Sequence, residues 1–209
     1  MAKGVKNSNE EKRNTFKEVP CIIGIDQSYT RTGIALAING KVIKTFSLDF
    51  KRINAKTNKR LETQKALNKI LDKCLKKYSS NQIVVIVERI RTYTNSLDLR
   101  PPVIKAQAAL MAYIVDTAFV RGVKTYSVDT RCWKSRILGS SKPIFEPIEG
   151  VTNPQKFGSV RKAIELGFNE EISVYRNGTR TSYNDDMADA ICIALYGFSG
   201  YPYQLQLEQ

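Results

Sequence analysis

The chain has no histidine among its 209 residues. This absence excludes a Ser-His-Asp triad, a Cys-His nucleophile pair, a histidine-bound zinc ion and an imidazole general base. Any catalysis must therefore use carboxylates, lysines, hydroxyls, thiols or a bound metal ion.

Long apolar runs are also lacking. The longest purely aliphatic run, Ile83 to Val87, is too short to cross a membrane, and the first twenty residues lack the apolar stretch of a signal peptide. The four cysteines are far apart and form no C-x-x-C pair, so neither a zinc site nor a redox pair is indicated. Their apolar neighbours fit buried thiols in a reducing compartment. We expect a soluble cytoplasmic protein with no membrane partner.

Acidic residues are few compared with basic ones. The chain has 20 Asp and Glu against 33 Lys and Arg, a net charge of +13. Such an excess favours a polyanionic partner, most often nucleic acid. An anionic membrane surface would also attract it, and a basic surface can be functionally indifferent.

Hydrophobic periodicity predicts one mixed α/β domain over residues 19–200, between a disordered basic tail (1–18) and a C-terminal tail (201–209). Three strands in succession form an antiparallel meander, with Asn39-Gly40 as a type I′ turn. The remaining strands alternate with helices. We expect strands at 21–25, 32–38, 41–50, 83–87 and 123–128. We expect helices at 57–78, 101–121, 130–138, 155–166 and 185–196. Residues 139–155 are expected to form an insertion loop, and residues 172–183 a hairpin.

Several carboxylates occupy positions where apolar elements end. Asp26 and Glu88 each follow an apolar strand directly, and a carboxylate there is costly to desolvate unless it is paired or metal-bound. Asp186 and Asp189 are three residues apart and share a face of the last helix. The helix dipole alone also favours acids in a first helical turn, which would explain this pair without a metal.

These four carboxylates would repel one another if the fold brought them together, unless cations neutralised them. Ligation by oxygen alone selects Mg²⁺ or Mn²⁺. Two such ions support in-line phosphoryl displacement, one activating water and the other stabilising the leaving oxygen. A basic surface around an acidic, metal-binding pocket is the electrostatic pattern that we expect of a nuclease.

Four segments together resemble the RuvC family of Holliday junction resolvases, which have the RNase H-like fold. They are Ile23-Gly-Ile-Asp26-Gln-Ser28, Thr32-Gly-Ile-Ala35, Val85-Ile-Val-Glu88 and Asp186-Met-Ala-Asp189-Ala-Ile-Cys-Ile-Ala194, and the match runs over roughly residues 20–198. The resemblance implies an α/β, RNase H-like fold: a five-stranded mixed sheet, made of the meander and two parallel strands, flanked by helices. A phage or viral member is suggested, acting in the bacterial host cytoplasm.

The resemblance also implies roles for individual residues. Asp26, Glu88, Asp186 and Asp189 would form a metal-binding catalytic tetrad. Lys134 and Lys156 match basic positions near the scissile phosphate, although ordinary solvated charge would also account for both. Helix 102–121 matches the family's dimer-interface helix, so a homodimer would cut two opposing strands. Gln27 stands where the family often has proline, and residues 139–155 and 172–183 extend the core of bacterial members.

Basic residues near the expected site are candidates for DNA binding. Residues 41–77 hold twelve Lys or Arg and three acids, a net charge of +9. Phosphate contact is the functional interpretation, and an exposed, solvated helix face is the competing one. Tyr93 lies near the place where bacterial members have an aromatic residue that wedges into the junction, and Arg91 aligns about as well. The candidates are Lys51, Arg52, Lys56, Lys59, Arg60, Arg89, Arg91, Tyr93 and Arg100.

The leading hypothesis is a metal-dependent, structure-selective endonuclease that cuts four-way and other branched DNA by paired phosphodiester cleavage, without a small-molecule cofactor. A second hypothesis keeps the RNase H-like fold but acts on an RNA–DNA hybrid or a transposition intermediate. A third is an actin-like ATPase or sugar-kinase fragment, and a fourth is a non-catalytic DNA-binding module.

Overall fold

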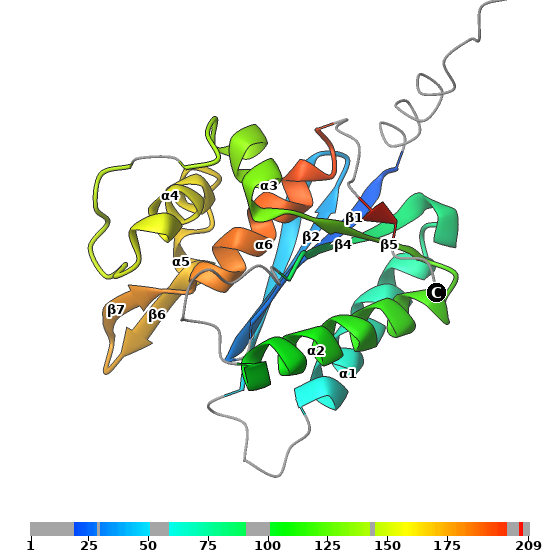
Figure 1. Cartoon of the computed structure of the whole chain (residues 1–209). Helices are drawn as coiled ribbons and strands as arrows, with labels where there is room; N and C mark the ends of the chain where they lie inside the picture. Colours follow the sequence, from blue (N-terminus) through cyan, green and yellow to red (C-terminus); the bar gives the residue numbers. More distant parts are fainter. Residues whose placement is uncertain are drawn as a thin grey trace, which may run out of the picture.

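The computed structural model describes residues 19–28, 30–50, 59–90, 101–142, 145–199 and 205–206. Its centre is one sheet with strand order β3-β2-β1-β4-β5-β8, and helices cover both faces (Figure 1). The expected α/β architecture with a five-stranded mixed sheet is confirmed, because strands β1 to β5 form it. Within these described ranges, no helix has the length and apolarity needed to span a membrane.

The first three strands form the expected antiparallel meander. They are β1 (Cys21–Gln27), β2 (Arg31–Ile38) and β3 (Lys41–Asp49). Asn39 and Gly40 join β2 to β3 with φ values of 49° and 79°, as a type I′ turn requires. The meander leaves β1 beside the parallel part of the sheet.

Two parallel strands complete the predicted sheet, and a further short strand lies at its edge. β4 (Ile83–Glu88) pairs with β1, and β5 (Lys124–Val128) pairs with β4, both in parallel. β8 (Leu205–Gln206) pairs antiparallel with β5, within the segment expected to be a tail. Two residues are too few to show a strand period, which is why the sequence pattern did not reveal it.

Helices lie in two layers. α1 (Lys59–Leu75) and α2 (Pro101–Phe119) pack on one face of the sheet, and α3 (Thr130–Ile137) and α6 (Asp185–Tyr196) pack on the other. The remaining elements are the 3₁₀ turns Ser80–Gln82 and Pro154–Lys156, the helices α4 (Phe157–Glu165) and α5 (Asn169–Ile172), and the separate hairpin of β6 (Ser173–Arg176) and β7 (Thr179–Tyr183).

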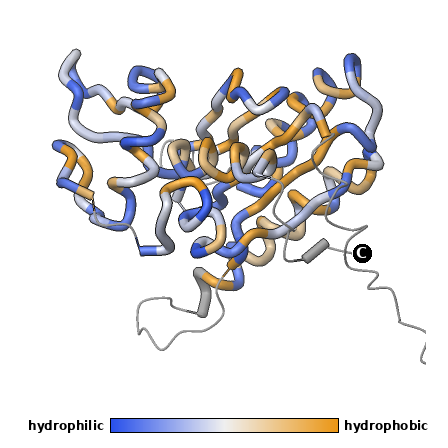
Figure 2. Tube along the Cα trace, turned by 90° about the horizontal axis from the view of Figure 1, so that it is seen from above, coloured by the Kyte–Doolittle hydropathy of each residue, from blue (hydrophilic) through white to orange (hydrophobic). Residues whose placement is uncertain are grey.

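Both faces of the central strands are buried. Ile23 and Ile25 of β1 face α1 and α2, whereas Ile22 packs with residues of α3 and α6. This alternation follows the two-residue period of a strand. Figure 2 shows the apolar residues concentrated along the central strands and the hydrophilic ones at the outer turns. The core therefore fixes the direction in which each residue of β1 and β4 points.

Two glycines allow α6 to lie unusually close to the sheet. A Cβ atom at Gly24 of β1 would overlap the backbone of Ala190 and Ala194. A Cβ atom at Gly33 of β2 would overlap the backbone of Asp186 in the first turn of α6. Because both contacts involve backbone, which cannot move aside cheaply, these two positions set the depth at which α6 sits.

Candidate functional site

The strand register brings two of the predicted carboxylates together. Ile25 of β1 pairs with Val87 of β4, so the next residues, Asp26 and Glu88, end the two parallel strands side by side. The strand period puts both on the face that α6 covers. Asp26 is buried, with 6% of its surface exposed, and Glu88 is partly buried.

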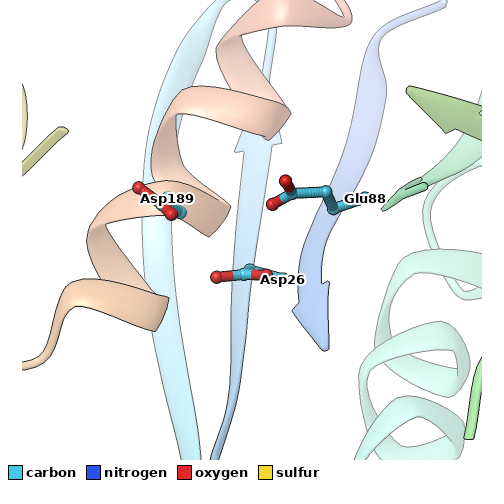
Figure 3. A group of neighbouring side chains, drawn as sticks. All are labelled: Asp26, Glu88 and Asp189. Carbon is cyan, nitrogen blue, oxygen red and sulfur yellow. The ribbon is translucent and has the colours of Figure 1, made fainter. Parts of the chain in front are cut away.

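A third carboxylate reaches the same point from the opposite layer. Asp189 lies in α6, and only 2% of its surface is exposed. One oxygen from each of Asp26, Glu88 and Asp189 lies within 4.8 Å of the others, and Figure 3 shows the three side chains directed toward a common space. Three carboxylates that are 62 or more residues apart in sequence thus form one acidic cluster.

The acidic cluster has the properties of a divalent cation site. Asp189 Oδ1 is buried and has no hydrogen-bond partner in the part of the chain that the structure describes. A buried, unsatisfied carboxylate oxygen is costly unless a cation approaches it. All the donors are carboxylate oxygens, the ligands that Mg²⁺ and Mn²⁺ prefer. These residues therefore fit the ions expected from the sequence.

Lys156 supplies a positive charge inside the cluster. Its ammonium donates a hydrogen bond to Asp189 Oδ2 at 2.5 Å and lies 3.7 Å from Asp26 Oδ2. Burial lowers the pKa of Lys156, but the neighbouring Asp189 and Asp26 raise it more, so the ammonium stays charged. Lys156 stands at the end of the 3₁₀ turn Pro154–Lys156, immediately before α4.

Burial and mutual repulsion make two of the carboxylates reluctant to ionise. Burial raises the pKa of Asp26 well above its ordinary value, and Glu88 and Asp189 add to the rise while Lys156 opposes it. Burial likewise raises the pKa of Glu88, again with a contribution from Asp189. Such shifts are characteristic of functional clusters.

Asp186, the fourth predicted carboxylate, lies at the edge of this cluster. It is partly buried in the first turn of α6 and is not among the three residues whose oxygens lie within 4.8 Å. Burial raises its pKa to about 6, while Lys156 and Arg31 act in the opposite direction. Its charge is felt at the centre, because Asp186 contributes to the raised pKa of Asp26.

Two residues that the sequence did not single out as functional hold Glu88. Thr130 Oγ1 donates a hydrogen bond to Glu88 Oε1, and Gln27 Nε2 donates to the backbone oxygen of Glu88 at 2.5 Å. Asp129 caps α3 by accepting a hydrogen bond from the Arg131 amide, so the Thr130 hydroxyl is not needed as a cap.

Lys134 contacts the segment that presents Lys156. Its ammonium donates to the Gln155 backbone oxygen at 2.9 Å and lies 5.4 Å from the Trp133 ring centroid. With 7% of its surface exposed, Lys134 is buried. The structure therefore brings Lys156 directly to the carboxylates and places Lys134 behind it.

The candidate DNA-binding residues are only partly described. Lys59 and Arg60 lie at the start of α1, 5.6 Å from the Phe50 ring centroid and 5.5 Å from that of Tyr113, respectively. Arg89 is exposed directly after Glu88, and its backbone amide donates to Val128. The other candidates lie outside the described residues: Lys51, Arg52, Lys56, Arg91, Tyr93 and Arg100.

The β3-β2-β1-β4-β5 sheet, in which β1, β4 and β5 are parallel, has the arrangement of the RNase H-like fold found in RuvC. Solved structures show the same likeness. The Thermus thermophilus RuvC structure aligns over 84% of this chain and 92% of its own, with 15% identity and a TM-score of 0.54. The same RuvC in complex with a Holliday junction substrate aligns over 84% and 90%, with 14% identity and a TM-score of 0.54.

A eukaryotic resolvase shows a similar likeness. The yeast mitochondrial Holliday junction resolvase Ydc2 aligns over 94% of this chain and 86% of its own, with 17% identity and a TM-score of 0.53. No protein-family model matches the sequence, and a search of curated proteins finds no match. At these identities the likeness concerns the fold.

Proposed function

We propose that the protein is a metal-dependent endonuclease that resolves four-way DNA junctions by paired phosphodiester cleavage, a crossover junction endodeoxyribonuclease. The observation that carries this proposal is the cluster of Asp26, Glu88 and Asp189 at the ends of two parallel strands. Its fold resembles that of a RuvC whose solved complex contains a Holliday junction substrate. The net charge of +13 supports a DNA partner.

Asp26, Glu88 and Asp189 would hold the metal, with Asp186 at the edge of the site. Bound Mg²⁺ or Mn²⁺, which we propose as two ions, would neutralise charge on a phosphate and lower the pKa of water. Thr130 and Gln27 keep the Glu88 carboxylate and its backbone in place. Asp26 and Asp189 are almost fully buried, and burial strengthens their attraction for a cation.

Lys156 has a second role in this proposal. Its ammonium pairs with Asp189 and Asp26, and it must give up these contacts when a cation takes its place. Lys156 would then be near enough to the site to contact a phosphate oxygen of the substrate. Lys134, which holds the preceding Gln155 backbone oxygen, would keep Lys156 within reach.

Paired cleavage requires two sites. We propose a homodimer through α2, because the end of this helix presents apolar surface to solvent: Phe119 is 62% exposed, and Val120, which directly follows the helix, is 82% exposed. Two copies related by a twofold axis would present two clusters to opposite strands of one junction.

The test is a cleavage panel of a four-way junction, a linear duplex and an RNA–DNA hybrid, each with Mg²⁺ and with Mn²⁺. We expect cutting of the junction at symmetric positions and little cutting of the other two. The Asp26→Asn variant should bind the junction but not cut it, because the amide keeps the shape and removes the charge. Cutting by Asp26→Asn at the wild-type rate would refute the site, and preferential cutting of the hybrid would refute the substrate.

A further inference from the structure

The β6–β7 hairpin projects from the domain and has no role in the proposed chemistry. Its two strands pair only with each other and form a sheet separate from the central one. Asn177 and Gly178 form the turn, with φ values of 51° and 78°. Residues Tyr175 to Thr181 are all exposed. A two-stranded hairpin is only marginally stable by itself in water, so its base must hold it.

The base of the hairpin is attached to α6, the helix that carries Asp186 and Asp189. Tyr183 is buried, and the backbone amide of Asn184 donates to the Ile172 oxygen at 2.6 Å. The Asn184 side chain caps α6 by accepting from the Met187 amide and also donates to Ser47 Oγ of β3 at 2.8 Å. Strand β7 thus leads through one residue into the helix that carries Asp186 and Asp189, and Figure 1 shows the hairpin projecting beside the start of α6.

The hairpin side chains suit the DNA backbone. Residues 173–183 contain two arginines, five side chains with Ser, Thr or Asn groups and two tyrosines, but no acid. Arginine and small hydroxyl or amide side chains are the groups that contact phosphate and sugar in protein–DNA complexes. A two-stranded ribbon also has the width to enter a DNA groove.

One of the two arginines lies beside the buried Tyr183 ring. The Arg180 guanidinium lies 4.8 Å from the Tyr183 ring centroid, and Arg180 pairs across the hairpin with Tyr175. The Tyr175 hydroxyl donates to Glu170 of α5 at 2.6 Å, which fixes that ring in turn. A guanidinium that already lies over an aromatic ring loses less conformational freedom when it binds a phosphate.

We propose that the β6–β7 hairpin is a DNA-contacting arm that binds the backbone of a duplex leading away from the cut. This inference rests on the proposed function, because it takes branched DNA as the substrate. Arg176 and Arg180 are the charged contacts, and the hairpin adds affinity without taking part in the chemical step.

The test compares two double variants. Arg176→Gln with Arg180→Gln removes the charges of the hairpin. Lys124→Gln with Lys142→Gln removes two exposed charges that lie outside the hairpin and outside the basic segment 41–77. Binding of a labelled four-way junction is measured by fluorescence anisotropy in EDTA, at KCl concentrations from about 50 to about 200 mM.

We expect the hairpin variant to reduce the slope of log affinity against log salt by about 2, and to weaken binding about tenfold near physiological salt. The control variant should change the slope and the affinity by less than the hairpin variant does. The cutting rate of the saturated complex should stay at the wild-type value. Equal effects of the two variants, or wild-type affinity and slope in the hairpin variant, would overturn the inference.

The same experiment distinguishes failure of the hairpin inference from failure of the proposed function. If the wild-type protein binds the junction but does not cut it, the nuclease proposal fails while the hairpin comparison still stands, because it is made without metal. If the wild-type protein binds no DNA, both proposals are overturned. A hairpin that serves a protein partner instead would leave DNA binding unchanged in the arginine variant.

Discussion

Lys156 is expected to stabilise the metal-free protein and to compete with the metal. Its ammonium touches Asp189, whose side chain is 2% exposed, and lies 3.7 Å from Asp26. The Lys156→Gln substitution keeps a side chain of similar reach but leaves these carboxylates without a counter-ion. Breaking a buried ion pair costs about 3–5 kcal/mol. Because the Lys156 side chain is 21% exposed and the carboxylates can bind protons instead, we expect about 3 kcal/mol.

The assay is thermal unfolding in EDTA and in MgCl₂. A loss of about 3 kcal/mol lowers the melting temperature by about 6–12 °C in a protein of this size. Mg²⁺ should restore more stability to Lys156→Gln than to the wild type, because the cation no longer has to displace an ammonium. Metal binding is thus read from stability and not from cleavage.

Lys162→Gln is the matched control. Lys162 lies on α4, the helix that follows Lys156, and its 3.4 Å pair with Glu165 is on the surface, where an ion pair contributes about 0–1 kcal/mol. The reasoning is wrong if Lys156→Gln melts at the temperature of Lys162→Gln in EDTA. It is also wrong if Mg²⁺ raises the melting temperature of the wild type and of Lys156→Gln equally.

Two further predictions concern helix α6 and pH. Gly33→Ala should destabilise the protein by roughly 3 kcal/mol and weaken the Mg²⁺-induced rise in melting temperature, because the new methyl group displaces the first turn of α6. Gly178→Ala is also strained, because the φ of Gly178 is 78°, but its Cβ meets nothing within 4 Å and the Mg²⁺-induced rise should stay intact. The pKa of Asp26 and that of Glu88 are raised, and the pKa of Asp186 is about 6, so ionising these groups costs stability. The metal-free protein should therefore lose stability as the pH rises from about 4 through 6. The stabilisation by Mg²⁺ should grow from about pH 5 to pH 8. Thermal unfolding measures both effects, and a larger stabilisation by Mg²⁺ at about pH 5 than at about pH 8 would contradict this prediction.

The strands and most helices could be predicted because their patterns are local. The apolar run Ile83–Val87 and the Asn39-Gly40 turn each depend on a few adjacent residues. Asp26 and Glu88 could be selected for a similar reason, since a carboxylate directly after a buried strand is conspicuous in the sequence. Their side-by-side position follows from the parallel pairing of β1 and β4.

The details that depend on loop paths could not be predicted. Lys156 reaches Asp189 because the segment before α4 folds back onto α6, and no sequence period describes that path. The sequence also grouped Asp186 with the other three carboxylates, but the three-residue spacing on a helix does not fix how far each side chain reaches. The hydrogen bond from Thr130 to Glu88 depends on how α3 follows β5.

The origin of the acidic cluster in three distant segments has a consequence for biosynthesis. Asp26, Glu88 and Asp189 are far apart in the chain, and Asp189 is added last, in a helix that must dock on Gly24 and Gly33. A nascent chain that has already paired β1 with β4 still lacks one side of the cluster. The acidic cluster is therefore complete only after the sheet and α6 have joined, so the proposed activity would be absent from incompletely synthesised chains.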